Sequence, residues 1–414
     1  MKGLAEIISI GDEVLSGYTV NTNAAFLARN LTENGFEVGW ITVVQDSHEE
    51  ILNVIEQARK RAAAVLITGG LGPTPDDITK KAICTYFDKK LVFDNAVLTQ
   101  VERYLNERNI EMNESNRNQA LIPQYDELMP NPMGTAPGLI YQKGHTYFIF
   151  MPGVPGEMRY MTKTYILPFL HKQLSPSKMQ NLILRTTGIP EARLYEKIRD
   201  IMEAYSMFPI AFLPRYIGVD IRFRLQSDMS SQHQQFRDFY HAVHHRVAKY
   251  VFAEEEIELE EALGNILHHR NLTLSLAESF TGGLISDLIT NIPGSSHYFS
   301  SAFTTYSNQS KIDLLGVRES TLKQYGAVSK AVAVEMARGV QISQQTDCAI
   351  ATTGIAGPGG QTAQKPVGLS YIAARYGSQE TVREFRFGTE RLINKKRGAV
   401  AGMELLRRLL LDLL

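Results

Sequence analysis

The segment Val65–Thr79 (VLITGGLGPTPDDIT) organises the first half of the chain, because it predicts a buried strand, a glycine-rich loop and then a helix. Gly70 and Gly72 lie in the loop, where residues without a side chain allow backbone N–H groups to approach a ligand closely. The N-terminus of the following helix favours anionic groups such as phosphate. The segment therefore predicts a binding site for a phosphorylated ligand at the end of the strand.

Two adjacent carboxylates, Asp76 and Asp77, open the predicted helix. A phosphate group would repel them unless a cation lay between, and hard divalent cations such as Mg²⁺ take oxygen ligands of this kind. The alternative is that Asp76 is only an N-cap and Asp77 a favourable charge in the first turn. The glycines of the same loop, and the rigid turn made by Pro73 and Pro75, favour the metal-assisted site.

Strands and helices alternate through the first 170 residues, which indicates an α/β domain with a parallel sheet. Ligands of such sheets bind outside the carboxyl ends of the strands. Asp12 and Asp46 also follow predicted strand ends, so we expect them to meet Asp76 and Asp77 in one crevice, although each alone is a common turn residue. The strands are predicted at 4–10, 37–44, 63–68 and 147–150, and the helices at 23–34, 49–61, 78–87 and 94–108.

Composition and charge exclude several classes of protein. The 414 residues carry a net charge of −1, with 44% hydrophobic and 21% charged residues, as in ordinary globular domains without a general attraction to nucleic acid or membranes. Cys84 and Cys348 are the only cysteines, which argues against a disulfide framework and favours a cytoplasmic location. No apolar stretch reaches the length of a membrane span, and the N-terminal run is too short for a signal peptide.

The middle of the chain reads as a small α+β module. A linker is expected at 173–177 and an acidic stretch at 254–261 marks the next boundary, so the predicted domains are 1–172, 173–253 and 254–414. Arg215, Arg222 and Arg224 form a basic patch in this module. RNA binding is one interpretation, but the Gly-x-x-Gly clamp is missing, and a solvated sheet face is favoured.

A second candidate site surrounds Ser279, which lies between a predicted strand at 273–277 and a predicted helix at 284–289. Backbone N–H groups of that turn, around Thr281 and Gly282, are positioned to stabilise an oxyanion. No credible Ser-His-Asp set is present, so the base would be a lysine, and Lys311 is the candidate. Tyr306 would relay a proton or orient the lysine. The alternative is that Ser279 is an N-cap and Lys311 a surface lysine.

On these residues the whole chain resembles the CinA (competence/damage-inducible) family of bacteria. In the N-terminal domain the resemblance rests on Gly11–Gly17, Asn21–Asn23, Thr68–Thr79, Gly134–Gly138 and Pro152–Met158. In the C-terminal domain it rests on Glu278–Gly283, Thr305–Asn308, Lys311, Gly326–Ser329 and Thr353–Pro358. The implied fold is a molybdopterin-binding MoaB/MogA-like α/β domain, a small KH-like α+β module, and a C-terminal α/β domain also found alone as a nicotinamide mononucleotide (NMN) deamidase.

The resemblance implies roles for particular residues. Ser279 matches the family's nucleophile, Lys311 its base partner and Tyr306 the assisting hydroxyl. Arg397 matches a cation facing the mononucleotide, although neighbouring lysines offer the same charge. The remaining substrate-binding positions implied in this way are Thr281, Gly282, Gly283, Thr353 and Gly354 in the C-terminal domain, and Asn23, Gly70, Gly72, Thr74 and Gly153 in the N-terminal domain.

The sequence also departs from the family pattern. Phe280 stands where the family usually has cysteine, which indicates that this cysteine is not the nucleophile. Pro75 precedes the acidic pair, and Gly359-Gly-Gln361 lacks the usual aspartate after Gly-Pro. These changes remove no proposed catalytic atom.

The resulting expectation is an enzyme with two activities. The C-terminal domain is expected to convert NMN to nicotinate mononucleotide and ammonia without a cofactor. The N-terminal domain is expected to cleave ADP-ribose with a divalent metal ion held by Asp12, Asp46, Asp76 and Asp77. The resemblance and a leucine-rich C-terminal helix predict a homodimer, and no nucleic acid or membrane partner is expected. The alternative is a non-catalytic nucleotide- or pterin-binding scaffold linked to competence.

Overall fold

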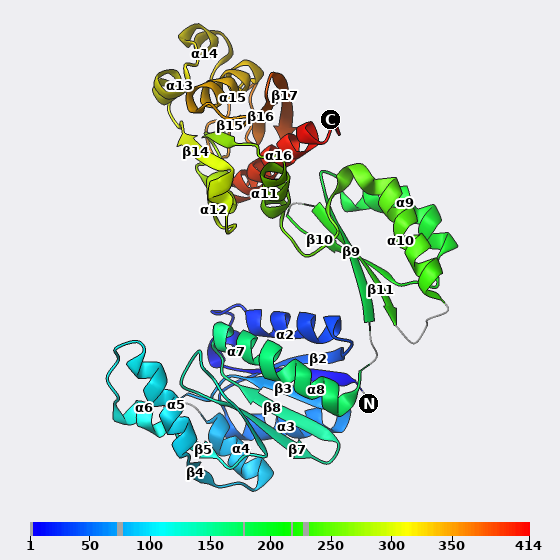
Figure 1. The fold of residues 1–414 in the computed structure, drawn as a ribbon, viewed down its shortest axis with the longest axis vertical. Helices are drawn as coiled ribbons and strands as arrows, with labels where there is room; N and C mark the ends of the chain where they lie inside the picture. Colours follow the sequence, from blue (N-terminus) through cyan, green and yellow to red (C-terminus); the bar gives the residue numbers. More distant parts are fainter. Residues whose placement is uncertain (1–2, 73–77, 177–178, 217, 227–231) are drawn as a thin grey trace. The chain divides into compact units, whose positions relative to one another are not determined.

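The computed structural model describes residues 3–72, 78–176, 179–216, 218–226 and 232–414 (Figure 1). The described residues divide into two compact units. The first comprises the N-terminal residues up to Gln180, and the second comprises Asn181–Leu225 together with the residues from 232 to Leu414. Each unit is described by itself.

The first unit is built on a six-stranded sheet. Its strand order is β2 (Glu37–Val44), β1 (Leu4–Ile10), β3 (Ala64–Thr68), β8 (Thr146–Met151), β7 (Gly138–Lys143) and β6 (Glu127–Met129). The first four strands are parallel, as predicted, and β7 and β6 extend the sheet in antiparallel fashion. The sequence did not predict these two strands, because β7 begins at Gly138, inside a Gly/Pro cluster typical of turns.

Helices cover both faces of this sheet. Alternate residues of β1 divide between two cores, since Ile8 and Ile10 pack on one face and Ala5 and Ile7 on the other. One face carries α2 (Thr22–Glu33), α7 (Pro155–Met161) and α8 (Leu167–Leu174). A π-helical turn at Thr162–Ile166 joins α7 to α8. The other face carries α3 (His48–Arg61), α4 (Thr79–Phe87) and α5 (Asn95–Asn106). The short elements are α1 (Asp12–Leu15), α6 (Glu114–Asn118), β4 (Leu91–Phe93) and β5 (Leu121–Pro123).

The ends of β1 and β3 approach each other at Gly69. This residue has a φ of 116°, and a β-carbon built on it would lie 2.2 Å from the backbone oxygen of Ile10. Only glycine fits such a close approach in this conformation. The first glycine after the apolar run therefore brings the two strand ends, and the loops that follow them, to one place.

The second unit begins with the predicted α+β module. Its sheet has the order β10 (Ile210–Pro214), β11 (Gly218–Gln226), β9 (Met179–Thr187) and β12 (Val251–Ala253). Helices α9 (Glu191–Ala204) and α10 (His233–Val247) share one hydrophobic core with this sheet, and a 3-10 turn at Ala248–Tyr250 leads into β12.

The acidic stretch after β12 binds the basic residues of the module. Arg222 pairs with Glu256, and Arg215 pairs with Glu258 at 2.8 Å. Arg185, which is only 1% exposed, contacts Glu258 at 3.1 Å and the backbone oxygen of Ile257. The basic patch that suggested RNA binding is thus partly neutralised by carboxylates of the same chain.

The rest of the second unit surrounds a five-stranded sheet in the order β14 (Phe299–Thr304), β13 (Leu274–Glu278), β15 (Cys348–Gly354), β16 (Leu369–Tyr376) and β17 (Gln379–Arg386). The first three strands are parallel, and β16 and β17 form an antiparallel hairpin. The helices α11 (Leu259–His269), α12 (Leu284–Thr290) and α16 (Arg391–Leu410) share one hydrophobic core. The helices α13 (Asn308–Leu315), α14 (Glu319–Tyr325) and α15 (Lys330–Gln344) share the other. A 3-10 turn lies at Ser295–His297.

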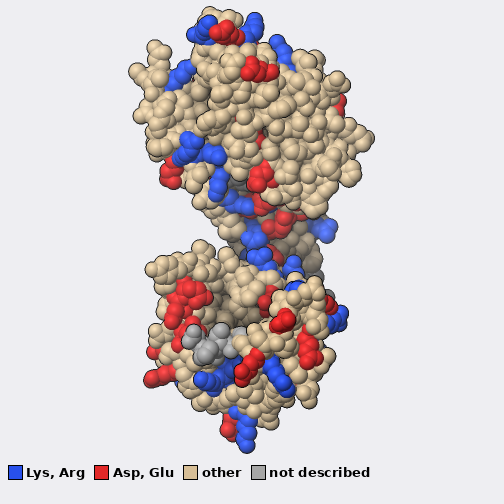
Figure 2. Space-filling model, turned by 90° about the vertical axis from the view of Figure 1, so that its left-hand side faces the viewer, with Lys and Arg blue, Asp and Glu red and all other residues tan. Residues whose placement is uncertain are grey.

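Charges of both signs are mixed on the surface. On the face drawn in Figure 2, Lys and Arg side chains are interspersed with Asp and Glu side chains. Among the described residues, no helix has the length and hydrophobicity needed to cross a membrane.

Candidate active sites

The strongest candidate site lies at the end of β13, the central strand of the C-terminal sheet. Ser279 follows this strand directly and is 8% exposed. The Nζ atom of Lys311 lies 3.3 Å from its Oγ atom. Lys311 lies in α13, a helix that the sequence did not predict, and it is 1% exposed. The structure therefore brings the predicted nucleophile and base together, and the lysine is buried.

The environment of Lys311 favours the neutral amine. Burial lowers the pKa of this lysine to about 8. Among the described residues no carboxylate pairs with it, and its other hydrogen bonds go to the backbone oxygens of Thr305 (2.6 Å) and Ser307 (3.5 Å). A neutral amine can donate its two hydrogens to these oxygens and turn its lone pair toward the Ser279 hydroxyl. This is the arrangement that a general base requires.

Glu278 holds the turn that carries Ser279. Its side chain is completely buried and accepts hydrogen bonds from the backbone N–H groups of Gly283 (3.0 Å), Ile285 (3.1 Å) and Ser286 (3.0 Å). These are N–H groups at the start of α12 that would otherwise lack partners. Sequence reasoning overlooked this residue, although a glutamate at the end of an apolar strand is an unusual position that could have drawn attention to it.

The same contacts limit which N–H groups can stabilise an oxyanion. The N–H of Gly282 donates to the Ser279 backbone oxygen at 3.1 Å, and that of Gly283 is taken by Glu278. Among the described residues no acceptor is recorded for the N–H groups of Phe280 and Thr281. The two groups available beside Ser279 are therefore those of Phe280 and Thr281, a shift of one residue from the expected Thr281 and Gly282.

The predicted hydroxyl partner, Tyr306, lies at the rim rather than between Ser279 and Lys311. Its side chain is 62% exposed, and its hydroxyl accepts a hydrogen bond from Nη2 of Arg391 at 2.8 Å. Nη1 of the same arginine donates to the backbone oxygen of Gly357. This hydrogen bond thus links Tyr306 to Arg391, a cation on α16.

Two cations on α16 face the Ser279 turn, and Arg397 is not one of them. A β-carbon built on Gly282 would lie 3.3 Å from Nζ of Lys395. Arg391 and Lys395 are four residues apart and share a helix face, whereas Arg397 is rotated by about 200° from Lys395. Arg397 instead lines a separate cavity with Gly188.

Close packing fixes the depth of α16 above the turn. A β-carbon on Gly398 would lie 2.3 Å from the ring of Phe280, and one on Gly354 would lie 3.0 Å from the same ring. Thr353 is buried, and its hydroxyl donates to the backbone oxygen of Ala327 at 2.7 Å. These predicted positions therefore shape the wall around Ser279 through packing and a loop contact.

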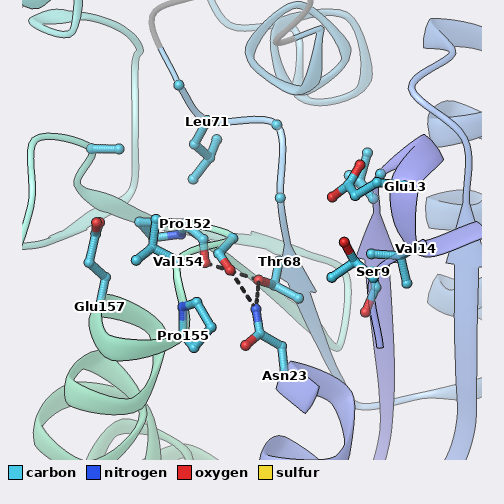
Figure 3. A pocket seen from close by; sticks show the side chains of 18 of the residues that line it. Ser9, Glu13, Val14, Asn23, Thr68, Leu71, Pro152, Val154, Pro155 and Glu157 are labelled. Carbon is cyan, nitrogen blue, oxygen red and sulfur yellow. Dashed lines mark hydrogen bonds between the residues drawn. The ribbon is translucent and has the colours of Figure 1, made fainter. Parts of the chain in front are cut away.

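The second candidate site is a pocket of about 520 Å³ at the carboxyl ends of β1, β3 and β8 (Figure 3). Asn23 in α2 reaches across it, and its Nδ2 donates to the backbone oxygen of Gly153 at 2.7 Å and to Oγ1 of Thr68 at 3.3 Å. Its Oδ1 atom is buried and has no partner among the described residues. Gly70, Gly72 and Gly153 also line this pocket.

The carboxylates expected around this pocket are placed only in part. Asp12 and Asp46 face each other, because the backbone N–H of each donates to the carboxylate of the other at 3.2 Å. Asp76, Asp77 and Thr74 lie outside the described residues. Within the described ranges, no group of three or more His, Cys, Asp or Glu side chains could hold a metal ion.

Glu157, a carboxylate in the first turn of α7 that was not among the predicted site residues, also lines the pocket (Figure 3). It accepts a hydrogen bond of 2.6 Å from Nδ2 of Asn131, and burial raises the pKa of its carboxyl group. Gly134 lies against it, since a β-carbon there would be 2.2 Å from the carboxyl carbon.

Comparison with known families agrees with this architecture. Residues 6–172 match a probable molybdopterin-binding domain, residues 182–253 the damage-inducible protein CinA KH domain, and residues 256–410 the CinA C-terminal domain. The fold is therefore that of a protein with a MoaB-like domain, a KH module and a C-terminal domain of the CinA type.

Two sequence relatives match over nearly the whole length. A putative competence-damage inducible protein of Caldicellulosiruptor saccharolyticus is 38% identical over 99% of this chain and 100% of its own. A CinA-like protein of Chloroherpeton thalassium is 41% identical over 98% of this chain and 99% of its own. A crystal structure of the competence/damage inducible protein CihA from Agrobacterium tumefaciens, 38% identical, covers 36% of this chain and 93% of its own, with a TM-score of 0.36. The chain belongs to the CinA family.

Proposed function

We propose that the C-terminal domain is an amidohydrolase that converts NMN and water to nicotinate mononucleotide and ammonia. The observation that supports it most is the buried lysine, whose Nζ atom lies 3.3 Å from Oγ of Ser279 and whose pKa is lowered to about 8 by burial. A serine activated by a neutral lysine is a nucleophile suited to carbonyl carbons.

The first half of the reaction forms an ester. Oγ of Ser279 attacks the carboxamide carbon of NMN while Nζ of Lys311 accepts the hydroxyl proton. The N–H groups of Phe280 and Thr281 stabilise the negative charge on the carboxamide oxygen. Protonated Lys311 then returns the proton to the leaving nitrogen, the C–N bond breaks, and ammonia departs.

The second half regenerates the enzyme. Lys311, neutral again, accepts a proton from a water molecule that attacks the ester carbon. The C–O bond to Ser279 breaks, and the serine oxygen takes the proton back from Lys311. The products are nicotinate mononucleotide and the free enzyme, and no cofactor takes part.

A direct test is to incubate the full chain with NMN and measure ammonia and nicotinate mononucleotide together. We expect both products in equal amounts. Hydroxylamine should divert the ester to the hydroxamate of the mononucleotide, which distinguishes a covalent route from direct attack by water. Absence of ammonia release would leave the C-terminal domain as the scaffold of the alternative hypothesis.

Lys395 is expected to bind the phosphate of NMN, because it is the cation beside Gly282. Replacing it by alanine should raise KM for NMN by roughly 10- to 100-fold, since a charge-assisted hydrogen bond is lost. Nicotinamide riboside, which lacks the phosphate, should be hydrolysed equally by wild type and variant.

The matched control is Lys396→Ala, whose lysine is the next residue but lies over the ring of Tyr216. Equal KM values for NMN in the Lys395→Ala and Lys396→Ala proteins would contradict the assignment.

We also propose that the N-terminal pocket cleaves the pyrophosphate of ADP-ribose to AMP and ribose 5-phosphate with a divalent metal ion. Two residues fit such an ion, because Asp12 and Asp46 present adjacent hard oxygen ligands. A bound divalent ion would polarise a phosphoryl oxygen and activate water. Backbone N–H groups of the loop at Gly70 and Gly72 would orient the phosphates.

Removal of the metal tests this second activity. Dialysis against a chelator should abolish ADP-ribose cleavage, and Mg²⁺ should restore it. Asp46→Asn should lower cleavage by roughly 10- to 100-fold, because it removes one ligand charge.

Asp88→Asn is the control, since Asp88 adopts a left-handed conformation that asparagine tolerates equally well. Cleavage that persists in the chelated protein would remove the metal from the proposal. Metal-dependent binding of ADP-ribose without cleavage would favour a scaffold.

We infer that the partners are small nucleotides rather than nucleic acids, because carboxylates of the same chain pair with arginines of the KH module. The cytoplasmic location and the homodimer remain predictions.

A further inference from the structure

A further cavity, of about 570 Å³, lies within the second unit between the KH module and the outer face of α16 and β17. Small-molecule sites in proteins usually occupy about 300–1,000 Å³. The walls are joined firmly, because Phe252 and Ala253 of β12 pack in the core of the C-terminal domain and buried Arg185 pairs with Glu258. Neither proposed activity uses this cavity.

Four arginines line the cavity, namely Arg215, Arg383, Arg397 and Arg408. No ion pair is recorded for Arg383 or Arg397 in the part of the chain that the structure describes. The Nη2 atom of Arg408 is buried without a hydrogen-bond partner, and its side chain is 11% exposed. The guanidinium groups of Arg383, Arg397 and Arg408 therefore have unused hydrogen-bond donors that would suit an anion.

The carboxylates in the wall do not cancel this charge. Glu404 is already bound by Arg407 at 2.7 Å and by Arg408 at 2.5 Å. Glu191, in the first turn of α9, is the other carboxylate, and Arg215 is the remaining cation, paired with Asp220 and Glu258. The cavity thus keeps an excess of positive charge.

An apolar platform lies next to the arginines. The rings of Phe385 and Phe387 are stacked, with centroids 5.5 Å apart and an interplanar angle of 16°. Arg383 and Phe385 share one face of β17, because alternate residues of a strand point the same way. Arginine forks bind phosphate by paired hydrogen bonds, and aromatic faces bind planar rings.

We propose that this cavity binds a monophosphorylated aromatic heterocycle of the nucleoside monophosphate class. The phosphate binds Arg397 and Arg408, and the ring lies on Phe385 and Phe387 beside Arg383. The site is distinct from the Ser279 turn, because Arg397 and Lys395 lie on opposite sides of α16.

The test is calorimetric titration of the full chain with inosine monophosphate, which is neither substrate nor product of the two proposed activities. Inosine and inorganic phosphate are titrated in parallel. We expect the monophosphate to bind at least ~10-fold more tightly than either part alone, since ring and phosphate each contribute. Arg397→Ala and Arg383→Ala should each weaken its binding by roughly 10-fold or more.

Matched variants separate this site from the others. Arg386→Ala changes an arginine on the same strand that is 71% exposed and paired with Glu384, and it should bind normally. Lys395→Ala and Asn23→Ala alter the other two pockets and should also bind normally. Ala401→Phe, which fills the cavity from α16, should abolish binding, and thermal unfolding checks that each variant is folded. Absence of binding to the wild type, or equal binding by the Arg383, Arg397 and Arg386 variants, overturns the proposal.

Discussion

Ser279→Ala is expected to lower ammonia release from NMN by ~10³-fold or more, because the variant has no atom that can form the ester. Only direct attack by water on the bound amide would remain. The binding of NMN should change little, since the serine hydroxyl contributes mainly to the transition state. The measurements are steady-state ammonia release and the dissociation constant of NMN for wild type and variant.

Ser301→Ala is the control for this prediction. Ser301 lies in β14 of the same sheet and bonds Gln344 instead of the site. A Ser279→Ala protein that released ammonia as fast as the Ser301→Ala protein would rule out the covalent mechanism. The N-terminal activity on ADP-ribose should be the same in both variants, which would show that the chain remains folded.

Lys311→Met is expected to reduce the turnover of NMN by roughly 10²–10⁴-fold, the usual contribution of a general base. The wild type should also show a characteristic pH profile. Because the amine must be neutral to accept a proton, and burial lowers its pKa to about 8, kcat/KM should rise with pH up to about 8 and then level off. At pH 7 only about one tenth of the enzyme would hold the neutral base.

The variant should lose this ascending limb of the profile, and its residual rate should no longer follow an ionisation near pH 8. Lys323→Met provides the comparison, since Lys323 is an exposed lysine paired with Glu319 on α14. An unchanged ascending limb in Lys311→Met would assign the ionisation to another group and contradict the proposed base.

The sequence predicted the alternation of strands and helices well, because strand and helix periods are local properties. It also placed Ser279 at a strand end beside a glycine turn. It did not predict α13, the helix that carries Lys311, whose apolar residues are few. The strand β7 was missed for a different reason, since glycines and prolines before it resembled a turn.

The orientation of α16 shows what the sequence could not supply. The helix at the C-terminus was expected, but the face that it turns toward Ser279 depends on packing against β15 and β16. Arg397, assigned by resemblance, lies on the other side, whereas Arg391 and Lys395 face the site. The small residues Gly398 and Gly402 mark the packed face, and their spacing relative to Lys395 is the signal that could have identified it.

The acidic stretch after β12 gave a further difference between sequence and structure. From the sequence, Glu256 and Glu258 are assigned to a solvent-exposed domain boundary, because runs of charged residues are usually exposed. Their partners are Arg222 in β11, Arg185 in β9 and Arg215 just after β10, which lie 34, 73 and 43 residues away in the chain, so only the folded chain reveals the pairing.

The contact between Gly398 and Phe280 has a consequence for how this family can vary. The ring of Phe280 fills the space that a side chain at 398 would need, so the two positions share one fixed volume. A relative with a smaller residue at 280 would leave more space beside position 398. Substitutions at these two sites are therefore coupled in size. A chimaera that places a side chain at 398 while keeping Phe280 would push α16, and Lys395 with it, away from the serine turn.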